Sequence, residues 1–296
     1  MTSRVYVSQD VVVRFAPSPN GLLHLGHAYA ALAAYDYARE RGGKLLLRIE
    51  DIDLGRSRPE FVDAILADLR WLGIDWDGEV IFQSRRLDSY AKAAEQLKEK
   101  GVLYPCFCTR SSLQTVQQDK RLKEGPDGPL YPGICRDIEK DEATTRASSE
   151  PHCWRLDIAK ALLLTGKLNW YDELHGKQVA DPAALGDVVI IPKDNPVSYH
   201  LAVTLDDARD GITHVVRGQD LFASTHIHRL LQALLMLPVP RYVHHPVLVD
   251  ETGGKLSKSR DSASLTLLRE AGESAYTVTS RLRNNIFPVG ITLSKA

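Results

Sequence analysis

The fourteen residues from Arg14 to His27, RFAPSPNGLLHLGH, constrain the fold of this chain more than any other stretch. The three valines at 11–13 directly precede this stretch and favour a buried strand. Apolar residues at 28–35, just after it, recur at helical spacing. A strand, a tight loop and a helix start therefore follow one another. In such a unit the first N–H groups of the helix, and the positive end of its dipole, suit an anionic phosphate beyond the strand end.

His24 and His27 flank Gly26 at this helix start, in the pattern H-x-G-H. Two imidazoles three residues apart can donate hydrogen bonds to one phosphate, and a glycine lets a flat purine ring approach the backbone. Two surface histidines near a helix start are the ordinary alternative, because a four-residue motif is weak by itself. The pattern predicts a nucleotide site only if a second motif supports it.

A second motif of this kind is the sequence KLSKS at residues 255–259, which follows two glycines. Two lysines on a glycine-flexed loop can close over a polyphosphate. A solvated basic loop is the alternative, but H-x-G-H stands far upstream in the same chain. The two motifs in this order resemble the signature of the class I aminoacyl-tRNA synthetases, and the residues from Val11 to about Ser259 resemble the glutamyl branch of that family.

This resemblance implies an α/β fold with several parts. We expect a doubly wound parallel-sheet (Rossmann-type) class I synthetase catalytic domain, interrupted by a zinc-containing subdomain where this class grips the tRNA acceptor end. Only 37 residues follow Ser259, so we expect no anticodon-binding domain. The predicted bounds are 1–105 for the first half of the catalytic domain, 106–186 for the insert, 187–245 for the second half, and 246–296 for the KLSKS loop and a short C-terminal segment.

Periodic segments predict the sheet and its scaffold. A buried strand is expected at 44–49, where it leads into Glu50. Amphipathic helices are expected at 58–71 and 87–97, and we assign them to packing alone. Ligands of doubly wound sheets lie beyond the carboxyl ends of the strands, so Arg14 and Glu50 should face one site.

The glutamyl family holds its amino acid with an R-F-A-P-S run and the Glu of R-I-E-D, and this chain contains both. The resemblance implies a glutamate pocket formed by Arg14, Phe15, Ala16, Pro17, Ser18, Glu50, Tyr199 and Arg217. Glu50 would face the ammonium group, and Arg217 is a natural fork for the side-chain carboxylate. A solvated strand end, a buried Tyr and a surface Arg are the ordinary alternatives. His200 stands where some members have Asn, so we assign it no contact.

The resemblance also implies an adenylation reaction that needs no protein nucleophile. The α-carboxylate of glutamate would attack the α-phosphate of ATP and release pyrophosphate, helped by positioning and charge stabilisation. The expected catalytic residues are His24, His27, Lys255 and Lys258. The expected ATP-binding residues are His24, Gly26, His27 and Lys258. Mg²⁺ would accompany the ATP.

Three cysteines, Cys106, Cys108 and Cys135, converge in the middle of the chain and offer three soft ligands. Zinc takes four ligands in a tetrahedron. Tyr131 completes a Tyr-x-x-x-Cys ending that resembles the zinc site of the glutamyl-queuosine tRNA(Asp) synthetases, so one structural Zn²⁺ on Cys106, Cys108, Tyr131 and Cys135 is implied. Cys153 is the rival fourth ligand, and we interpret it as a core thiol. Three buried cysteines without a metal are the other alternative.

The composition is that of an ordinary globular protein, with 44% hydrophobic and 25% charged residues. The most apolar run, residues 230–239, is about half a bilayer span, so no membrane segment is expected. The N-terminus lacks an apolar signal region, which makes the cytoplasm the expected compartment and makes the four cysteines thiols or metal ligands. A formal net charge of −1 excludes a general nucleic-acid binder, so RNA contacts should be local. We expect a monomer.

Within the glutamyl branch, the short C-terminus implies the glutamyl-queuosine tRNA(Asp) synthetases, which place glutamate on queuosine in the anticodon loop. The expected partners are ATP, L-glutamate and tRNA(Asp) bearing queuosine. The alternative enzyme is a catalytic fragment of a glutamyl-tRNA synthetase that charges tRNA(Glu). A regulatory RNA-binding paralogue is disfavoured because both motifs are intact. A small-molecule nucleotidyltransferase would need neither the three cysteines nor Arg217.

Overall fold

The computed structural model describes residues 10–119, 122–126, 128–254, 256 and 264–295. Two of the predicted catalytic residues, Lys255 and Lys258, lie outside the described residues. In the part of the chain that is described, no helix has both the length and the apolar character needed to span a membrane.

A parallel sheet forms the centre of the molecule. It consists of two hydrogen-bonded sets of strands. The first is β3 (Ile81–Phe82), β2 (Lys44–Ile49) and β1 (Val12–Phe15), and the second contains β11 (His214–Gly218), β12 (Arg241–His245) and β8 (Asn169–Asp172), in these spatial orders. Strands β1 and β11 are joined through Thr213, whose N–H donates to the Val12 carbonyl at 2.9 Å. The pairings of β1 with β2, β2 with β3, β11 with β12 and β12 with β8 are all parallel. The predicted parallel sheet is therefore confirmed.

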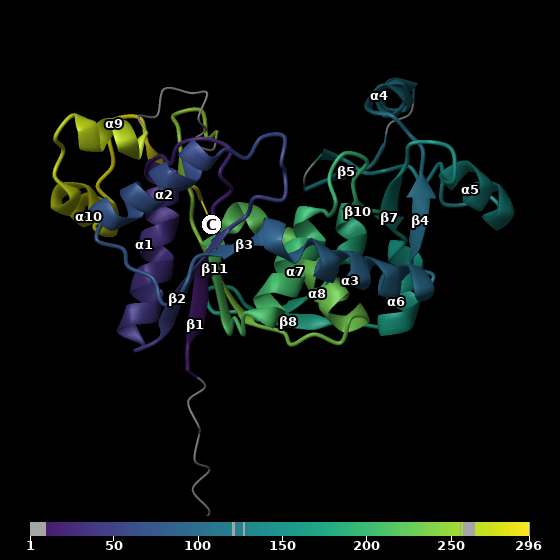
Figure 1. The fold of residues 1–296 in the computed structure, drawn as a ribbon, viewed down its shortest axis with the longest axis horizontal. Helices are drawn as coiled ribbons and strands as arrows, with labels where there is room; N and C mark the ends of the chain where they lie inside the picture. The colour runs from purple at the N-terminus through teal and green to yellow at the C-terminus, as the bar shows by residue number, and fades with distance from the viewer. Residues whose placement is uncertain (1–9, 120–121, 127, 255, 257–263, 296) are drawn as a thin grey trace, which may run out of the picture.

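Helices lie on both sides of these strands, as Figure 1 shows for α1 on one side and for α7 and α8 on the other. The helices of this part are α1 (Leu25–Glu40), α2 (Pro59–Trp71), α3 (Leu87–Glu99), α7 (Tyr199–Arg209) and α8 (Ser224–Leu234), with short 3₁₀ turns η1 (Gln83–Arg86) and η3 (Gln219–Leu221). Helix α1 buries Ala31 and Leu32 against strand residues such as Val13. Helices α7 and α8 bury Leu201 and Leu231 in a second core.

An antiparallel sheet forms the insert, seen at the right of Figure 1. It consists of β10 (Val189–Ile191), β7 (Cys153–Leu156) and β4 (Leu103–Cys106). Around it lie α4 (Arg110–Asp119), β5 (Glu124–Gly125), β6 (Gly128–Pro129), α5 (Lys140–Ala147) and α6 (Ile158–Thr165). Strand pairing crosses the predicted boundary between residues 186 and 187, because β10 belongs to the insert's sheet. It also places β8 in the parallel sheet, with β9 (Gly176–Val179) as its antiparallel neighbour and η2 (Pro182–Leu185) following.

The C-terminal segment packs back on the first half of the sheet. Strand β13 (Leu248–Val249) pairs with β14 (Thr292–Leu293), and between them α9 (Leu265–Glu270) and α10 (Ala275–Arg283) contact α2 and α1. The N–H of Leu265 donates to the Leu23 carbonyl at 2.8 Å. His24 also forms an isolated antiparallel bridge with Ser264, so the start of α9 lies beside the H-x-G-H motif.

Candidate active site and metal centre

A cavity of about 420 Å³ opens where the carboxyl ends of β1, β2 and β11 meet the start of α1. It is lined by every described residue that the sequence assigned to glutamate or ATP: Arg14, Phe15, Ala16, Pro17, Ser18, His24, Gly26, His27, Glu50, Tyr199 and Arg217. Leu256, which lies between the two motif lysines in the sequence, lines the same cavity. The structure thus brings the two predicted sets of residues into one site, as expected for the edge of a doubly wound sheet.

The two motif histidines cap the first turn of α1. His24 is the N-cap, and its Nδ1 accepts the Gly26 N–H at 3.1 Å, while the His27 Nδ1 accepts the His24 N–H at 3.2 Å. Their ring centroids are 3.9 Å apart. Because each Nδ1 is an acceptor, the neutral form of each ring carries its proton on Nε2. Each ring thus carries an N–H donor at the helix start, where an anionic phosphate is also favoured by the dipole.

A glycine is favoured at position 26 for a structural reason, in addition to the predicted approach of a purine ring. A Cβ at this position would lie 3.0 Å from His24 Cε1 and 3.1 Å from its Nδ1. These distances are shorter than ordinary van der Waals contacts. A larger residue would push the His24 ring away from the backbone N–H that it caps.

A buried network of charged side chains forms the floor below the cavity. Arg14 Nε donates to Asp207 Oδ1 at 3.0 Å, and Arg48 Nη1 donates to the same oxygen at 2.8 Å. Arg48, fully buried, also contacts Glu50 at 3.3 Å and Asp210 at 3.4 Å. Asp207 thus fixes the position of Arg14, and Arg48 fixes that of Glu50, the two residues that the sequence assigned to the glutamate pocket. Buried ion pairs of this kind depend on complete partnering, because a lone buried charge is costly.

The Glu50 carboxyl has a pKa near neutral pH. Burial raises its pKa from 4.5 to about 7, although the charges of Arg48 and Arg14 act to lower it. An ammonium group entering the cavity would favour the ionised form. This electrostatic setting suits the predicted contact with the α-ammonium of an amino acid.

Arg217, at the end of β11, reaches the opposite side of the cavity. Its guanidinium is held by side chains that the sequence did not assign to the site: His244 accepts from Nε at 3.0 Å, and Thr225 Oγ1 accepts from Nη2 at 2.6 Å. Tyr199 Oη lies 3.4 Å from Nη1. The predicted partners Tyr199 and Arg217 are therefore adjacent, and the fork is oriented before any ligand arrives.

The cysteine cluster lies at the edge of the insert's sheet. The Sγ atoms of Cys106, Cys108 and Cys135 all lie within 4.8 Å of one another. Tyr131 Oη is 3.3 Å from Cys106 Sγ and 3.6 Å from Cys108 Sγ, and the Sγ atoms of Cys108 and Cys135 are 3.7 Å apart. A tetrahedral zinc with Zn–S of about 2.3 Å and Zn–O of about 2.0 Å separates its ligand atoms by about 3.5 to 3.8 Å. The three separations given above are close to that spacing, so the cluster is compatible with a metal ion.

Cys153 faces Cys106 across the β4–β7 pairing but is not a member of this cluster. Hydrogen bonds to Cys106, of which the one from Cys153 is the strongest, lower the pKa of the Cys106 thiol to about 4. Burial raises the pKa of Cys108 to about 11. Zinc binds thiolates, so the charge of a bound zinc ion would offset the free-energy cost of ionising the Cys108 thiol.

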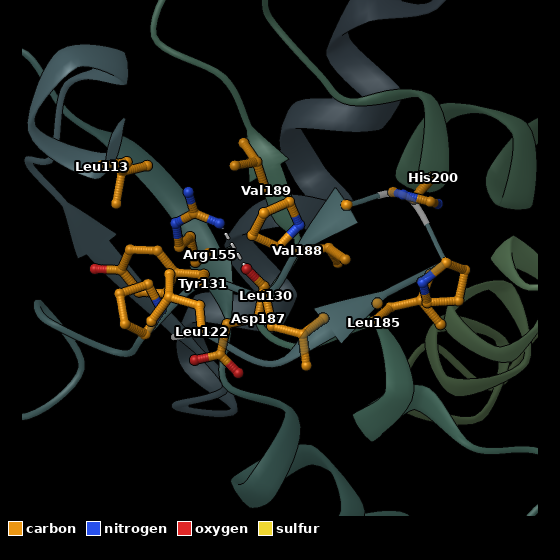
Figure 2. A pocket seen from close by; sticks show the side chains of 15 residues that line it. Leu113, Leu122, Leu130, Tyr131, Arg155, Leu185, Asp187, Val188, Val189 and His200 are labelled. Atoms are coloured by element: carbon orange, nitrogen blue, oxygen red, sulfur yellow. Dashed lines mark hydrogen bonds between the residues drawn. The ribbon is translucent and has the colours of Figure 1, made fainter. Parts of the chain in front are cut away.

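A second cavity, of about 320 Å³, lies between the insert and the start of α7. Figure 2 shows Tyr131 and Arg155 on one side of it and His200 on the other. Arg155 lies 3.9 Å from the centre of the Tyr131 ring and donates to the Asp187 carbonyl at 2.7 Å. This cavity therefore adjoins the predicted metal centre, and His200 separates it from the residues around Arg217.

Residues 10–292 match the family model described as tRNA synthetases class I (E and Q), catalytic domain. The chain belongs to this family. It is accordingly a ligase of the aminoacyl-tRNA synthetase type, as the resemblance implied.

Relatives of this synthetase support the glutamyl branch. The Glutamyl-Q tRNA(Asp) synthetase of Rhodobacter capsulatus is 43% identical over 271 residues, which cover 89% of this chain and 96% of the relative. The protein of the same name from Symbiobacterium thermophilum is 40% identical, with 91% and 84% covered. The crystal structure of a glutamate-tRNA synthetase from Elizabethkingia anophelis superposes with a TM-score of 0.72 at 30% identity, and this chain spans about half (53%) of its length.

Several side chains at the site were missed by sequence reasoning. Arg48 lies inside an apolar strand, and Asp207 is 193 positions from its partner Arg14. His244 and His228 were not assigned to the site from the sequence. Only tertiary contacts reveal their relation to Arg217, because no local spacing connects them.

Proposed function

We propose that this synthetase activates L-glutamate with ATP and transfers the glutamyl group to the queuosine of tRNA(Asp). The observation that carries the proposal is the single cavity that holds both the H-x-G-H donors and the predicted glutamate residues. Relatives named Glutamyl-Q tRNA(Asp) synthetase in four bacteria are 39% to 43% identical to this chain, and they support the choice of RNA.

In the activation step, a carboxylate oxygen of glutamate attacks the α-phosphorus of ATP. The bond from that phosphorus to the bridging oxygen of the β-phosphate breaks, and pyrophosphate leaves with the electron pair. His24 and His27 would donate hydrogen bonds to the phosphates, and Lys255 and Lys258 would neutralise the leaving group. Mg²⁺ bound with ATP would supply further charge neutralisation.

The amino acid would be held by charge at both ends. Glu50 would bind its ammonium group, and Arg217 would bind its side-chain carboxylate. Arg14 would complete the floor, held by Asp207. These contacts would orient the α-carboxylate towards the nucleotide, which is how positioning contributes to the rate of a reaction between two bound substrates.

In the transfer step, a hydroxyl of the queuosine cyclopentene ring attacks the acyl carbon of glutamyl-adenylate. An ester forms, the bond to AMP breaks, and the hydroxyl proton leaves with the phosphate or with solvent. The queuosine-bearing loop would reach the cavity from the open side, next to the insert.

Zn²⁺ would be held by Cys106, Cys108, Tyr131 and Cys135, with Cys153 behind them. Its contribution would be structural: it would tie β4 to the loop that carries Tyr131 and Cys135. The cytoplasmic location and the monomeric state stay predictions from the sequence.

Pyrophosphate exchange tests the activation step. The full chain, incubated with ATP and each amino acid in turn, with and without tRNA, should exchange label only with L-glutamate. Mapping the labelled nucleotide after transfer would then identify the acceptor. Exchange with another amino acid alone would overturn the proposed substrate.

A further inference from the structure

Within the described part of the chain, no carboxylate contacts the Arg217 guanidinium. Its hydrogen bonds among the described residues go to five acceptors, namely His244 Nε2, Tyr199 Oη, His228 Nδ1, the Leu221 carbonyl and Thr225 Oγ1. Hydroxyls and carbonyls are neutral. The charge on Arg217 therefore depends on the two histidines for any compensation.

The other two buried arginines near the cavity differ from Arg217 in this respect. Arg14 and Arg48 share the carboxylate of Asp207, at 3.0 Å and 2.8 Å. Arg48 also reaches Glu50 at 3.3 Å. Their charges are balanced inside the protein, whereas no ion pair of Arg217 occurs among the described residues.

His244 is fixed as a neutral acceptor. Arginine has no lone pair to offer, so the Arg217 Nε–H must donate to His244 Nε2, which leaves the proton of His244 on Nδ1. That Nδ1–H donates to Asp172 Oδ2 at 2.7 Å. Burial, the first cause, lowers the pKa of His244 to about 4, although Asp172 acts to raise it. The imidazole thus stands as a neutral spacer between Asp172 and Arg217.

His228 is fixed in the same way on the other side. Its Nδ1 accepts from Arg217 Nη1 at 3.3 Å, so its proton is on Nε2, which donates to His200 Nδ1 at 3.3 Å. Burial, and then the charge of Arg217, hold the pKa values of His228 and His200 below their ordinary value. His200 ends this chain of contacts at the second cavity (Figure 2).

We infer that His228 and His244 are positioning residues that orient Arg217 through neutral acceptors, so that its charge is left for the side-chain carboxylate of the substrate and the site selects glutamate over glutamine. The inference rests on the proposed function. A carboxylate in either position would pair with Arg217 inside the protein. The side-chain carboxylate of glutamate would then meet an Arg217 whose charge is already neutralised. Glutamate would no longer bind more tightly than glutamine.

The test is a matched pair of variants, His228→Asn and His228→Asp. The Asn Oδ1 can replace the Nδ1 acceptor without charge, whereas Asp has the same shape and adds a carboxylate beside Arg217. Titration calorimetry of the full chain with L-glutamate and with L-glutamine gives the dissociation constants. We expect His228→Asp to bind glutamate at least tenfold more weakly than His228→Asn, about 1.4 kcal/mol, and to lose most of the preference over glutamine.

Equal glutamate binding by the two variants would overturn the inference, because a packing role alone would affect both alike. If neither variant folds, the wild-type chain decides: a preference for glutamate over glutamine of tenfold or more supports a free charge on Arg217, and equal binding refutes it. A wild-type chain that binds neither amino acid would instead refute the proposed function.

Discussion

Glutamate binding should become tighter as the pH rises through neutrality, and the reason lies in the Glu50 carboxyl. Its pKa is raised by burial to about 7. At pH 6 about a tenth of the free sites would be ionised and at pH 8 about nine-tenths. The substrate ammonium binds the ionised form, so the apparent dissociation constant should fall about tenfold over this range.

The sign follows from which form the ligand stabilises. An ammonium close to Glu50 lowers its pKa, so binding at pH 6 releases a proton and is weakened by the excess of protons. The carboxylates and the ammonium of glutamate keep their charges between pH 6 and 8. Burial places the pKa values of His200 and His244 at about 4, so these histidines stay neutral throughout.

Titration calorimetry with L-glutamate at pH 6, 7 and 8, without ATP, measures the effect without the chemical steps. Repeating the pH 6 titration in buffers of different ionisation enthalpy should show about one proton released per glutamate bound. Glu50→Gln is the control: its affinity should be independent of pH and, at pH 8, about tenfold weaker or more, since a contact to a charged group contributes about 1.5 to 3 kcal/mol. A wild-type affinity that is flat with pH, or a slope that persists in Glu50→Gln, would refute the reasoning.

Three further outcomes are expected. His27→Ala should lower glutamate-dependent pyrophosphate exchange by about a hundredfold or more with an unchanged circular dichroism spectrum, because it removes one donor to the phosphates; near-normal exchange would refute its catalytic role. Lys258→Ala should have an effect of similar size in the same assay, and an unaffected rate would remove this lysine from the mechanism. The purified chain should contain about one zinc, and Cys108→Ser should lose it because a hydroxyl is a poor substitute for a thiolate; native protein prepared without chelator that contains no zinc would contradict the metal centre.

Local sequence patterns and the family resemblance together predicted this candidate cavity in outline. The strand at 44–49 and the helices at 58–71 and 87–97 are confirmed as β2, α2 and α3. The residues assigned to glutamate line one cavity with H-x-G-H because a parallel sheet brings the carboxyl ends of β1, β2 and β11 to one edge. Periodicity defines each element, and the fold class defines where the elements meet.

The support behind that cavity could not be predicted in this way. Arg48 reads as a polar residue in the strand KLLLRI, yet it is fully buried and binds Asp207, 159 positions away. Asp172 and His244 are 72 positions apart and meet only because β8 and β12 are neighbours in the sheet. Strand order, and not local pattern, selects such partners. The same reason explains why β10 joins the insert's sheet across the predicted boundary at 186–187.

Transfer of labelled glutamate to three tRNAs tests the central claim most directly. The full chain with ATP is offered tRNA(Asp) with queuosine, tRNA(Asp) without it, and tRNA(Glu), and the label is mapped by nuclease digestion. We predict an alkali-labile ester on the queuosine of tRNA(Asp) and no product with the other two, because queuosine-free tRNA(Asp) lacks the nucleophile. Efficient charging of tRNA(Glu) at its 3′ end would contradict this account and favour a glutamyl-tRNA synthetase activity for the same cavity.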